Sequence, residues 1–136
     1  MSCKSVVLGD NQHFKGYTIF LCKEHKTELF QLDDSVKMKF LKEMSIVAEA
    51  VSKAFNAEKM NYELLGNGDT HLHWHLFPRR KDDIENYGNN GKGPVWWYPM
   101  ENMYDDANRP SDKKLKEMKN KLLQELDKLF NLDVNN

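Results

Sequence analysis

The sequence predicts an α+β domain in which helices pack on an antiparallel sheet, and two observations lead to this prediction. Short segments rich in β-branched and aromatic residues occur early and in the middle of the chain, and apolar residues recur at steps of three and four in two other segments. Their order is strands, a helix, strands and a helix, which is typical of this class. A length of 136 residues suits one domain.

Two strands are expected in the first third of the chain. Ser5 to Leu8 is short and contains two valines. Gly16 to Cys22 (GYTIFLC) is rich in Tyr, Thr, Ile and Phe and follows turn residues, which is a stronger strand pattern.

A long helix is expected from about Asp33 to Asn56. Its N-terminal N–H groups can be capped by Asp33, Asp34 or Ser35. The apolar residues that form one face over about five turns are Val36, Phe40, Leu41, Met44, Val47, Val51 and Phe55.

The chain then returns to strands. Lys59 to Leu65 is expected to be extended and to end at the turn sequence Gly-Asn-Gly-Asp of residues 66–69. A further strand is expected from Thr70 to Phe77, where Pro78 would stop it.

The last third is expected to be a loop followed by a helix. Residues 81–94 are polar and rich in Gly and Asn, which indicates a surface loop, and 95–98 (VWWY) form an aromatic cluster within this region. The aromatic cluster either fills an apolar gap or contacts a ligand. Ser111 can cap a helix whose apolar face holds Leu115, Met118, Leu122, Leu126 and Leu129.

Charge and hydropathy exclude some classes of function. Lys plus Arg total 20 and Asp plus Glu total 21, so no basic excess is present to bind nucleic acid through bulk charge. No apolar run reaches the length of about 20 residues that a membrane span needs. The first residues lack the pattern of a signal peptide, so we expect a cytoplasmic protein without nucleic-acid or membrane partners.

Three of the five histidines lie within five residues, in THLHWHLFPRR. Side chains alternate between the two faces of a strand, so His71, His73 and His75 are expected on one face and apolar side chains on the other. His25, in CKEHK, is expected to be a structural corner residue.

Three interpretations of this histidine face are open. The first is a set of surface or core histidines with satisfied hydrogen bonds. The second is a metal site, because imidazole is a common metal ligand. The third is covalent catalysis at phosphorus, in which one imidazole nitrogen attacks a phosphate while the other donates its proton to a backbone carbonyl.

The run from His71 to Arg79 resembles the signature of the histidine triad (HIT) superfamily of nucleotide hydrolases and transferases, in which three histidines alternate with apolar residues before Pro-Arg. The segment 16–32 resembles a strand of the family, the corner that follows it (with Cys22 in place of a proline) and the approach to the long helix. The segment 60–67 resembles the strand that leads to an Asn before the signature. The resemblance covers roughly Val6 to Arg80.

The resemblance implies a HIT fold, an antiparallel sheet of about five strands with a long central helix and a C-terminal helix. It implies one HIT domain over 1–136, with a core at about 5–80 and a C-terminal loop and helix at 81–136. It further implies a homodimer that cleaves at a nucleoside α-phosphate through a nucleotidyl-histidine intermediate, acting for example on a dinucleoside polyphosphate or an adenosine phosphoramidate.

The resemblance also assigns the catalytic residues. His73 matches the nucleophile, His75 the residue beside the phosphate oxygens and the leaving group, and His71 the residue that supports the hydrogen bonds of the nucleophile.

Three further residues match substrate-binding positions by resemblance. Asn67 matches an amide near the phosphate and sugar, and Asp10 matches a ribose-binding acid. Thr70 lies in the short segment where many members carry a polar side chain near the phosphate.

The sequence departs from the family at two places. Tyr17 stands where part of the family has a further histidine, and the segment from Asn67 to His71 is short and includes the acidic Asp69. These departures bear on the choice of substrate.

The expected function is therefore nucleotide hydrolysis or transfer, without a tightly bound cofactor and with Mg²⁺ entering only together with the substrate. Two alternatives remain from the residues alone. One is a nucleotide-binding module with weak catalysis, and the other is a metallohydrolase that uses the three histidines as ligands.

Overall fold

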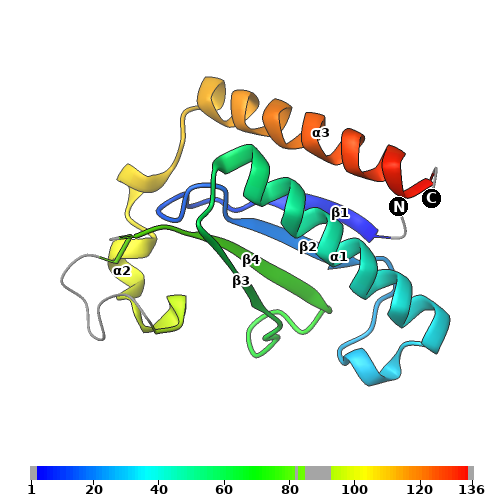
Figure 1. Ribbon diagram of the computed structural model, residues 1–136. Coiled ribbons are helices and arrows are strands. Elements are labelled where there is room, and N and C mark those ends of the chain that lie inside the picture. Colours follow the sequence, from blue (N-terminus) through cyan, green and yellow to red (C-terminus); the bar gives the residue numbers. More distant parts are fainter. Residues whose placement is uncertain (1–2, 82, 85–92, 135–136) are drawn as a thin grey trace.

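A four-stranded antiparallel sheet and two long helices form the architecture. The computed structural model describes residues 3–81, 83–84 and 93–134. Within this part of the chain the strand order is β1 (Cys3–Leu8), β2 (Thr18–Cys22), β4 (His73–Arg79) and β3 (Lys59–Glu63). Helices α1 (Asp34–Phe55) and α3 (Asp112–Val134) lie on the same side of the sheet (Figure 1). The expected α+β fold is confirmed, with four described strands where about five were expected.

The main core lies between this helical layer and the sheet. Phe40, Val47 and Val51 of α1 are buried against Phe20 of β2 and Leu76 of β4. The predicted apolar face of the last helix is confirmed, because Met118, Leu122 and Leu126 are buried in the same cluster. Burying apolar area is the main favourable contribution to folding, so this core holds the sheet as a rigid support for its other face.

A second, smaller core covers part of the opposite face of the sheet. It is formed by the buried residues Phe14, Tyr17, Phe77, Ile84, Val95 and Met103. The 3-10 helix η3 (Val95–Trp97) and the short helix α2 (Met100–Met103) supply its outer layer. The aromatic cluster predicted at 95–98 therefore fills an apolar gap through Val95. Most of the surface loop predicted for 81–94 lies outside the described residues.

Arg79 ties β4 to its neighbours beside this second core. Its Nε and Nη2 donate to the carboxylate of Asp83 at 2.7 and 3.0 Å, and its Nη1 donates to Asn61 Oδ1 on β3 at 2.9 Å. The side chain is buried, and a buried guanidinium requires such partners. Arg79 thus braces the chain near the histidine strand.

The strand predicted for 70–77 begins and ends later than the sequence suggested. Regular pairing starts at His73, while the preceding Leu72 bonds to the corner after β2, with its N–H on Lys26 O at 2.9 Å. Pro78 lies inside β4 and opposite Met60, but the pairing of β4 with β2 ends at Leu76. A proline is tolerated here because the strand has a partner on one side only.

Short elements complete the described chain. None of the described helices combines the length and the hydropathy of a membrane span. The 3-10 helices are η1 (Leu29–Gln31), before α1, and η4 (Asp106–Asn108), before α3. Ser111 caps α3 as predicted, since its Oγ accepts the N–H of Lys114 at 3.2 Å.

The turn before β2 generates a prediction about stability. Gly16 has φ +99°, and a Cβ there would lie 2.6 Å from Cδ2 of Phe55, at the end of α1. Gly16→Ala therefore adds both backbone strain and overpacking, and we expect it to lower the free energy of unfolding by about 2 kcal/mol or more. Urea denaturation followed by circular dichroism measures this change.

The matched control is Gly68→Ala, because Gly68 has no heavy atom within 4 Å of the added Cβ position. We expect that variant to stay within about 0.5 kcal/mol of the native protein. Equal losses in the two variants would contradict the role given to the turn at Gly16.

Candidate active site

His73 and His75 lie on β4 and face away from helices α1 and α3. The neighbours that alternate with them, Trp74 and Leu76, pack into the helical core. Glu63 of β3 stands directly opposite His75 in the antiparallel register. The expected separation into an imidazole side and an apolar side therefore holds for the two histidines on the strand.

A pocket of about 320 Å³ opens beside these two histidines. Its wall is formed by the turn between β3 and β4, by the two imidazoles and by one indole. The lining residues are Leu65, Gly66, Asn67, Gly68, Asp69, His73, His75 and Trp96.

The backbone fixes the orientation and tautomer of His73. Its Nδ1 lies 2.5 Å from the carbonyl oxygen of His71, and its Nε2 lies 3.0 Å from Nε2 of His75. A carbonyl oxygen can only accept, so we assign the proton of the neutral ring to Nδ1. Nε2 then carries a lone pair at the pocket, which is the state that a nucleophilic imidazole needs.

His75 is held from its other side by a phenol. The hydroxyl of Tyr17 lies 2.6 Å from Nδ1 of His75, and the Tyr17 ring stacks on Phe77 at 4.2 Å. Gly9 makes room for that ring, because a Cβ at residue 9 would overlap it. The structure thus brings Tyr17, the departure noted in the sequence, into direct contact with a histidine of the signature.

Burial keeps both members of this pair uncharged at neutral pH. Burial, and then repulsion from His73, lowers the pKa of His75 from 6.5 to about 4. Burial likewise raises the pKa of the Tyr17 hydroxyl above its ordinary value of 10.0. A neutral phenol therefore faces a neutral imidazole across a short hydrogen bond.

His71 lies before the strand, and its ring turns away from the pocket. Its Nε2 lies 2.9 Å from the carbonyl oxygen of Cys22, and its Nδ1 lies 2.8 Å from Nδ1 of His25. The structure thus joins His25 to the signature, although the sequence analysis treated it as a corner residue. Only the tertiary structure reveals this contact, because backbone hydrogen bonds of Leu72 align the corner after β2 with the start of β4.

The three predicted substrate-binding residues lie in different places. Asn67 lines the pocket, whereas Thr70 is exposed and does not line it. Asp10 lines a separate depression of about 160 Å³, together with Arg109 and Pro110. Asp69 lines the pocket, but one of its carboxylate oxygens accepts the N–H of His71 at 3.1 Å.

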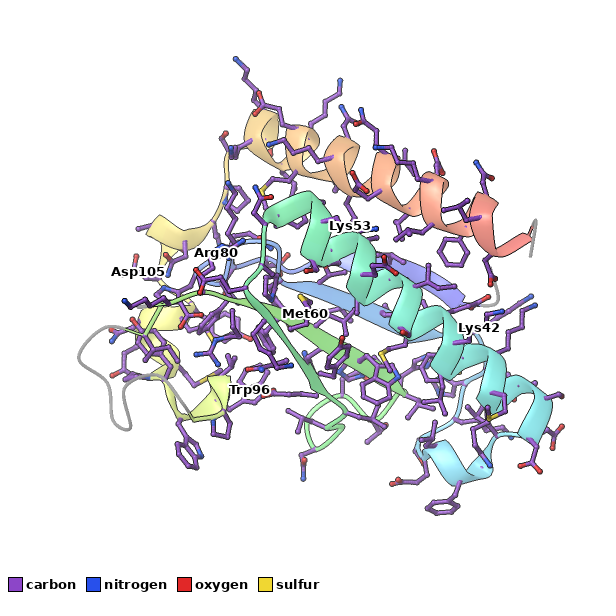
Figure 2. All side chains as sticks on the ribbon, viewed as in Figure 1. Lys42, Lys53, Met60, Arg80, Trp96 and Asp105 are labelled. Atoms are coloured by element: carbon purple, nitrogen blue, oxygen red, sulfur yellow. The ribbon has the colours of Figure 1, made fainter. Side chains whose placement is uncertain are left out.

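Trp96 closes the pocket on the side of His75. It lies on the side of the sheet away from α1 and α3 (Figure 2), and its ring meets His75 edge-on at 5.4 Å. Its Nε1 and Oε2 of Glu63 are both buried without a hydrogen-bond partner among the described residues. Burial raises the pKa of Glu63, and the Trp96 indole opposes this effect.

The imidazoles are not arranged as a ligand set for a metal ion. Both ring nitrogens of His71 have protein partners outside the pocket, and Nδ1 of His73 is bonded to a carbonyl. Among the described residues no group of three or more His, Cys, Asp or Glu side chains is placed to hold a metal. The metallohydrolase alternative has no geometric support in this part of the chain.

Comparison with known proteins points to the same family as the histidine pattern of β4. The model of the family described as "HIT domain" matches residues 4–82, which is more than half of the chain. No curated protein matches the sequence significantly.

Several solved structures share the fold. A histidine triad protein from Sinorhizobium meliloti is similar with a TM-score of 0.73 and 24% identity, over 91% of this chain and 83% of the other. One from Bradyrhizobium japonicum has a TM-score of 0.73 and 19% identity, over 93% and 86%. One from Marinobacter aquaeolei has a TM-score of 0.70 and 24% identity, over 91% and 82%.

The alternating histidines on β4, the extent of the family match and the shared fold agree, and the chain belongs to the HIT family.

Proposed function

We propose that this protein is a nucleotide hydrolase or transferase that cleaves the bond between a nucleoside α-phosphate and its leaving group, through a nucleotidyl intermediate on His73. The observation that carries the proposal is the hydrogen bond between Nδ1 of His73 and the carbonyl oxygen of His71, which leaves Nε2 as a nucleophile at the pocket. Membership in a superfamily of nucleotide-binding hydrolases and transferases supports the same chemistry.

The first step forms a P–N bond and breaks the bond to the leaving group. Nε2 of His73 attacks the α-phosphorus, and the leaving group departs with the bonding electron pair. Positive charge develops on the imidazole, and the His71 carbonyl, which already accepts a hydrogen bond from Nδ1–H, stabilises that charge. Water, or another acceptor, then attacks the phosphorus and forms a P–O bond, and the P–N bond breaks with its electron pair returning to Nε2. His73 is again neutral, and the proton of the attacking group is released to solvent.

His75 acts beside the nucleophile. Its Nε2 is 3.0 Å from Nε2 of His73, so a phosphoryl group bonded to His73 comes within hydrogen-bond reach of it. A donor at this point stabilises the charge on the phosphoryl oxygens in the transition state. His71 contributes through its carbonyl oxygen, and its ring aligns the segment through Cys22 and His25.

We assign Asn67 to the phosphate end of the substrate, because its side chain and the glycine-rich turn line the pocket beside both imidazoles. Asp10 and Thr70 stay predictions as substrate contacts, since neither lines this pocket. The homodimer, the cytoplasmic location and the lack of a tightly bound cofactor also stay predictions. So do the entry of Mg²⁺ with the substrate and the lack of nucleic-acid and membrane partners.

His73→Ala tests the proposed intermediate. We expect this variant to lose turnover by about 10⁴-fold or more while it still binds nucleoside monophosphate, because the pocket keeps its other walls. Rapid quenching of the native protein with labelled diadenosine polyphosphate should trap an acid-labile adduct on His73. Turnover that survives in the variant would end the assignment.

The control for this test is His13→Gln, which changes a histidine outside the pocket. His13 stacks on Tyr98 and bonds to the carbonyl oxygen of Asp83. We expect the adduct to form in this variant as in the native protein. Tight nucleotide binding without any adduct in the native protein would favour the binding-module alternative instead.

The lowered pKa of His75 predicts a pH dependence of stability. The pKa is about 4 in the folded protein and 6.5 as an ordinary value, so between these pH values the unfolded chain binds more protons at this site. Stability therefore falls as the pH drops from 6.5 to 4. We expect urea midpoints to fall further over this range in the native protein than in His75→Gln, and equal slopes would contradict the pKa shift.

A further inference from the structure

We propose that this site cleaves nucleotides whose leaving group departs as a stable anion, and that Tyr17 sets this preference by fixing His75 as a neutral hydrogen-bond donor. The preferred substrates are then mixed anhydrides of a nucleoside monophosphate with phosphate, sulfate or a carboxylate. Phosphoramidates with an alkylamine leaving group would be poor substrates. This inference rests on the proposed function and narrows its substrate class.

The hydrogen bonds around His75 define the position of each proton when all the groups are neutral. Because Nδ1 of His73 donates to a carbonyl, Nε2 of His73 must accept from Nε2 of His75. His75 then has no proton on Nδ1, which accepts a hydrogen bond from the Tyr17 hydroxyl at an O–N distance of 2.6 Å. Tyr17, His75, His73 and the carbonyl of His71 are thus joined by three successive hydrogen bonds, each of which contains one proton.

A neutral His75 can donate a hydrogen bond from Nε2 but cannot give up that proton readily. Loss of the proton would require Nδ1 to take one from Tyr17, and this would leave a phenolate in a buried place. Burial disfavours that phenolate, since it raises the pKa of the Tyr17 hydroxyl. The pair therefore stabilises negative oxygens without acting as an acid.

Among the residues that the structure describes, no other group at the pocket replaces the missing acid. The groups that face His75 are His73 on the same strand, Tyr17 before β2, Glu63 on β3 and Trp96 from η3. Glu63 is the one among them whose charge would favour a protonated imidazole, but its buried Oε2 has no hydrogen-bond partner among the described residues, and burial and His73 lower the pKa of His75 to about 4. The described residues that line the pocket include no Lys or Arg.

The consequence for the leaving group follows from its basicity. A phosphate has a second pKa of about 6 and a carboxylate one of about 4, so each departs as an anion and takes the electron pair of the P–O bond without a proton. An alkylamine, whose conjugate acid has a pKa of about 10, must be protonated before the P–N bond breaks. Only the first class reacts well at a site that supplies hydrogen bonds and no proton.

The first arm of the test observes the protons directly. Long-range ¹H–¹⁵N correlation spectra of the native protein at pH 7 should show His75 as the neutral Nε2–H form and His73 with hydrogen on Nδ1. Tyr17→Phe should change the His75 signals, whereas Tyr62→Phe, at an exposed tyrosine on β3, should not. An imidazolium or an Nδ1–H form at His75 in the native protein would overturn the proposal.

The second arm measures how the rate depends on the leaving group. Aryl esters of AMP with phenols of graded acidity, adenylyl sulfate and an alkylamine phosphoramidate of AMP are compared by kcat/KM. We expect the kcat/KM of the native protein to fall by about 100-fold or more as the pKa of the leaving phenol rises by about three units, and to be lowest for the phosphoramidate. Comparable rates across the series would overturn the inference while the proposed function stands.

Two variants separate a positioning role of Tyr17 from a merely structural one. Tyr17→Phe keeps the ring stack on Phe77, and we expect it to lower kcat by about tenfold on the best substrate with little change in KM, because His75 loses its fixed tautomer. Tyr17→His adds a group that can carry a proton at neutral pH, and we expect it to flatten the dependence on the leaving group. A dependence as steep as in the native protein would show that Tyr17 does not set the preference.

Failure of every substrate in the native protein would remove both the proposed function and this inference.

Discussion

The hydrogen bond between the His73 imidazole and the carbonyl oxygen of His71 is the constraint on which the proposed chemistry depends. A carbonyl oxygen has no proton to give, so this contact decides which nitrogen of His73 carries hydrogen and which carries a lone pair. The bond is local in sequence, since its two residues are two positions apart. It forms because regular strand geometry begins at His73 and the chain before it bends toward the corner after β2.

The rest of the fold keeps this local bond in one geometry. The core under α1 and α3 holds β4 from the apolar side, and the Arg79 hydrogen bonds to Asp83 and Asn61 tie its far end to β3 and to the following segment. The smaller core places Trp96 against His75. A catalytic group on a strand that is fixed in these ways loses little entropy when it reacts, which is the advantage of a rigid scaffold.

Tyr17 links the small core to the site. Its ring belongs to the cluster with Phe77 and Val95, while its hydroxyl reaches Nδ1 of His75. A phenol and an imidazole at one position both form a hydrogen bond, but they differ in the charge they can hold: an imidazole takes up a proton near neutral pH, and a buried phenol remains neutral. A single residue outside the signature can therefore alter which leaving groups the site accepts while the nucleophile is unchanged.

The sequence alone determined the class of the fold, the family and the strand face that carries two of the histidines, and tertiary contacts decided the rest. The three-and-four spacing of apolar residues located α1 and α3, and the alternation of histidines with Leu and Trp placed His73 and His75 on one face of a strand, because both patterns reflect local backbone geometry. The start of β4 after His71, the inclusion of Pro78, the contact of His25 with His71 and the distance of Asp10 from the pocket were not foreseen. Each of these depends on which distant segment pairs with or packs against the residue, and that pairing is set by the whole sheet and not by neighbours in sequence.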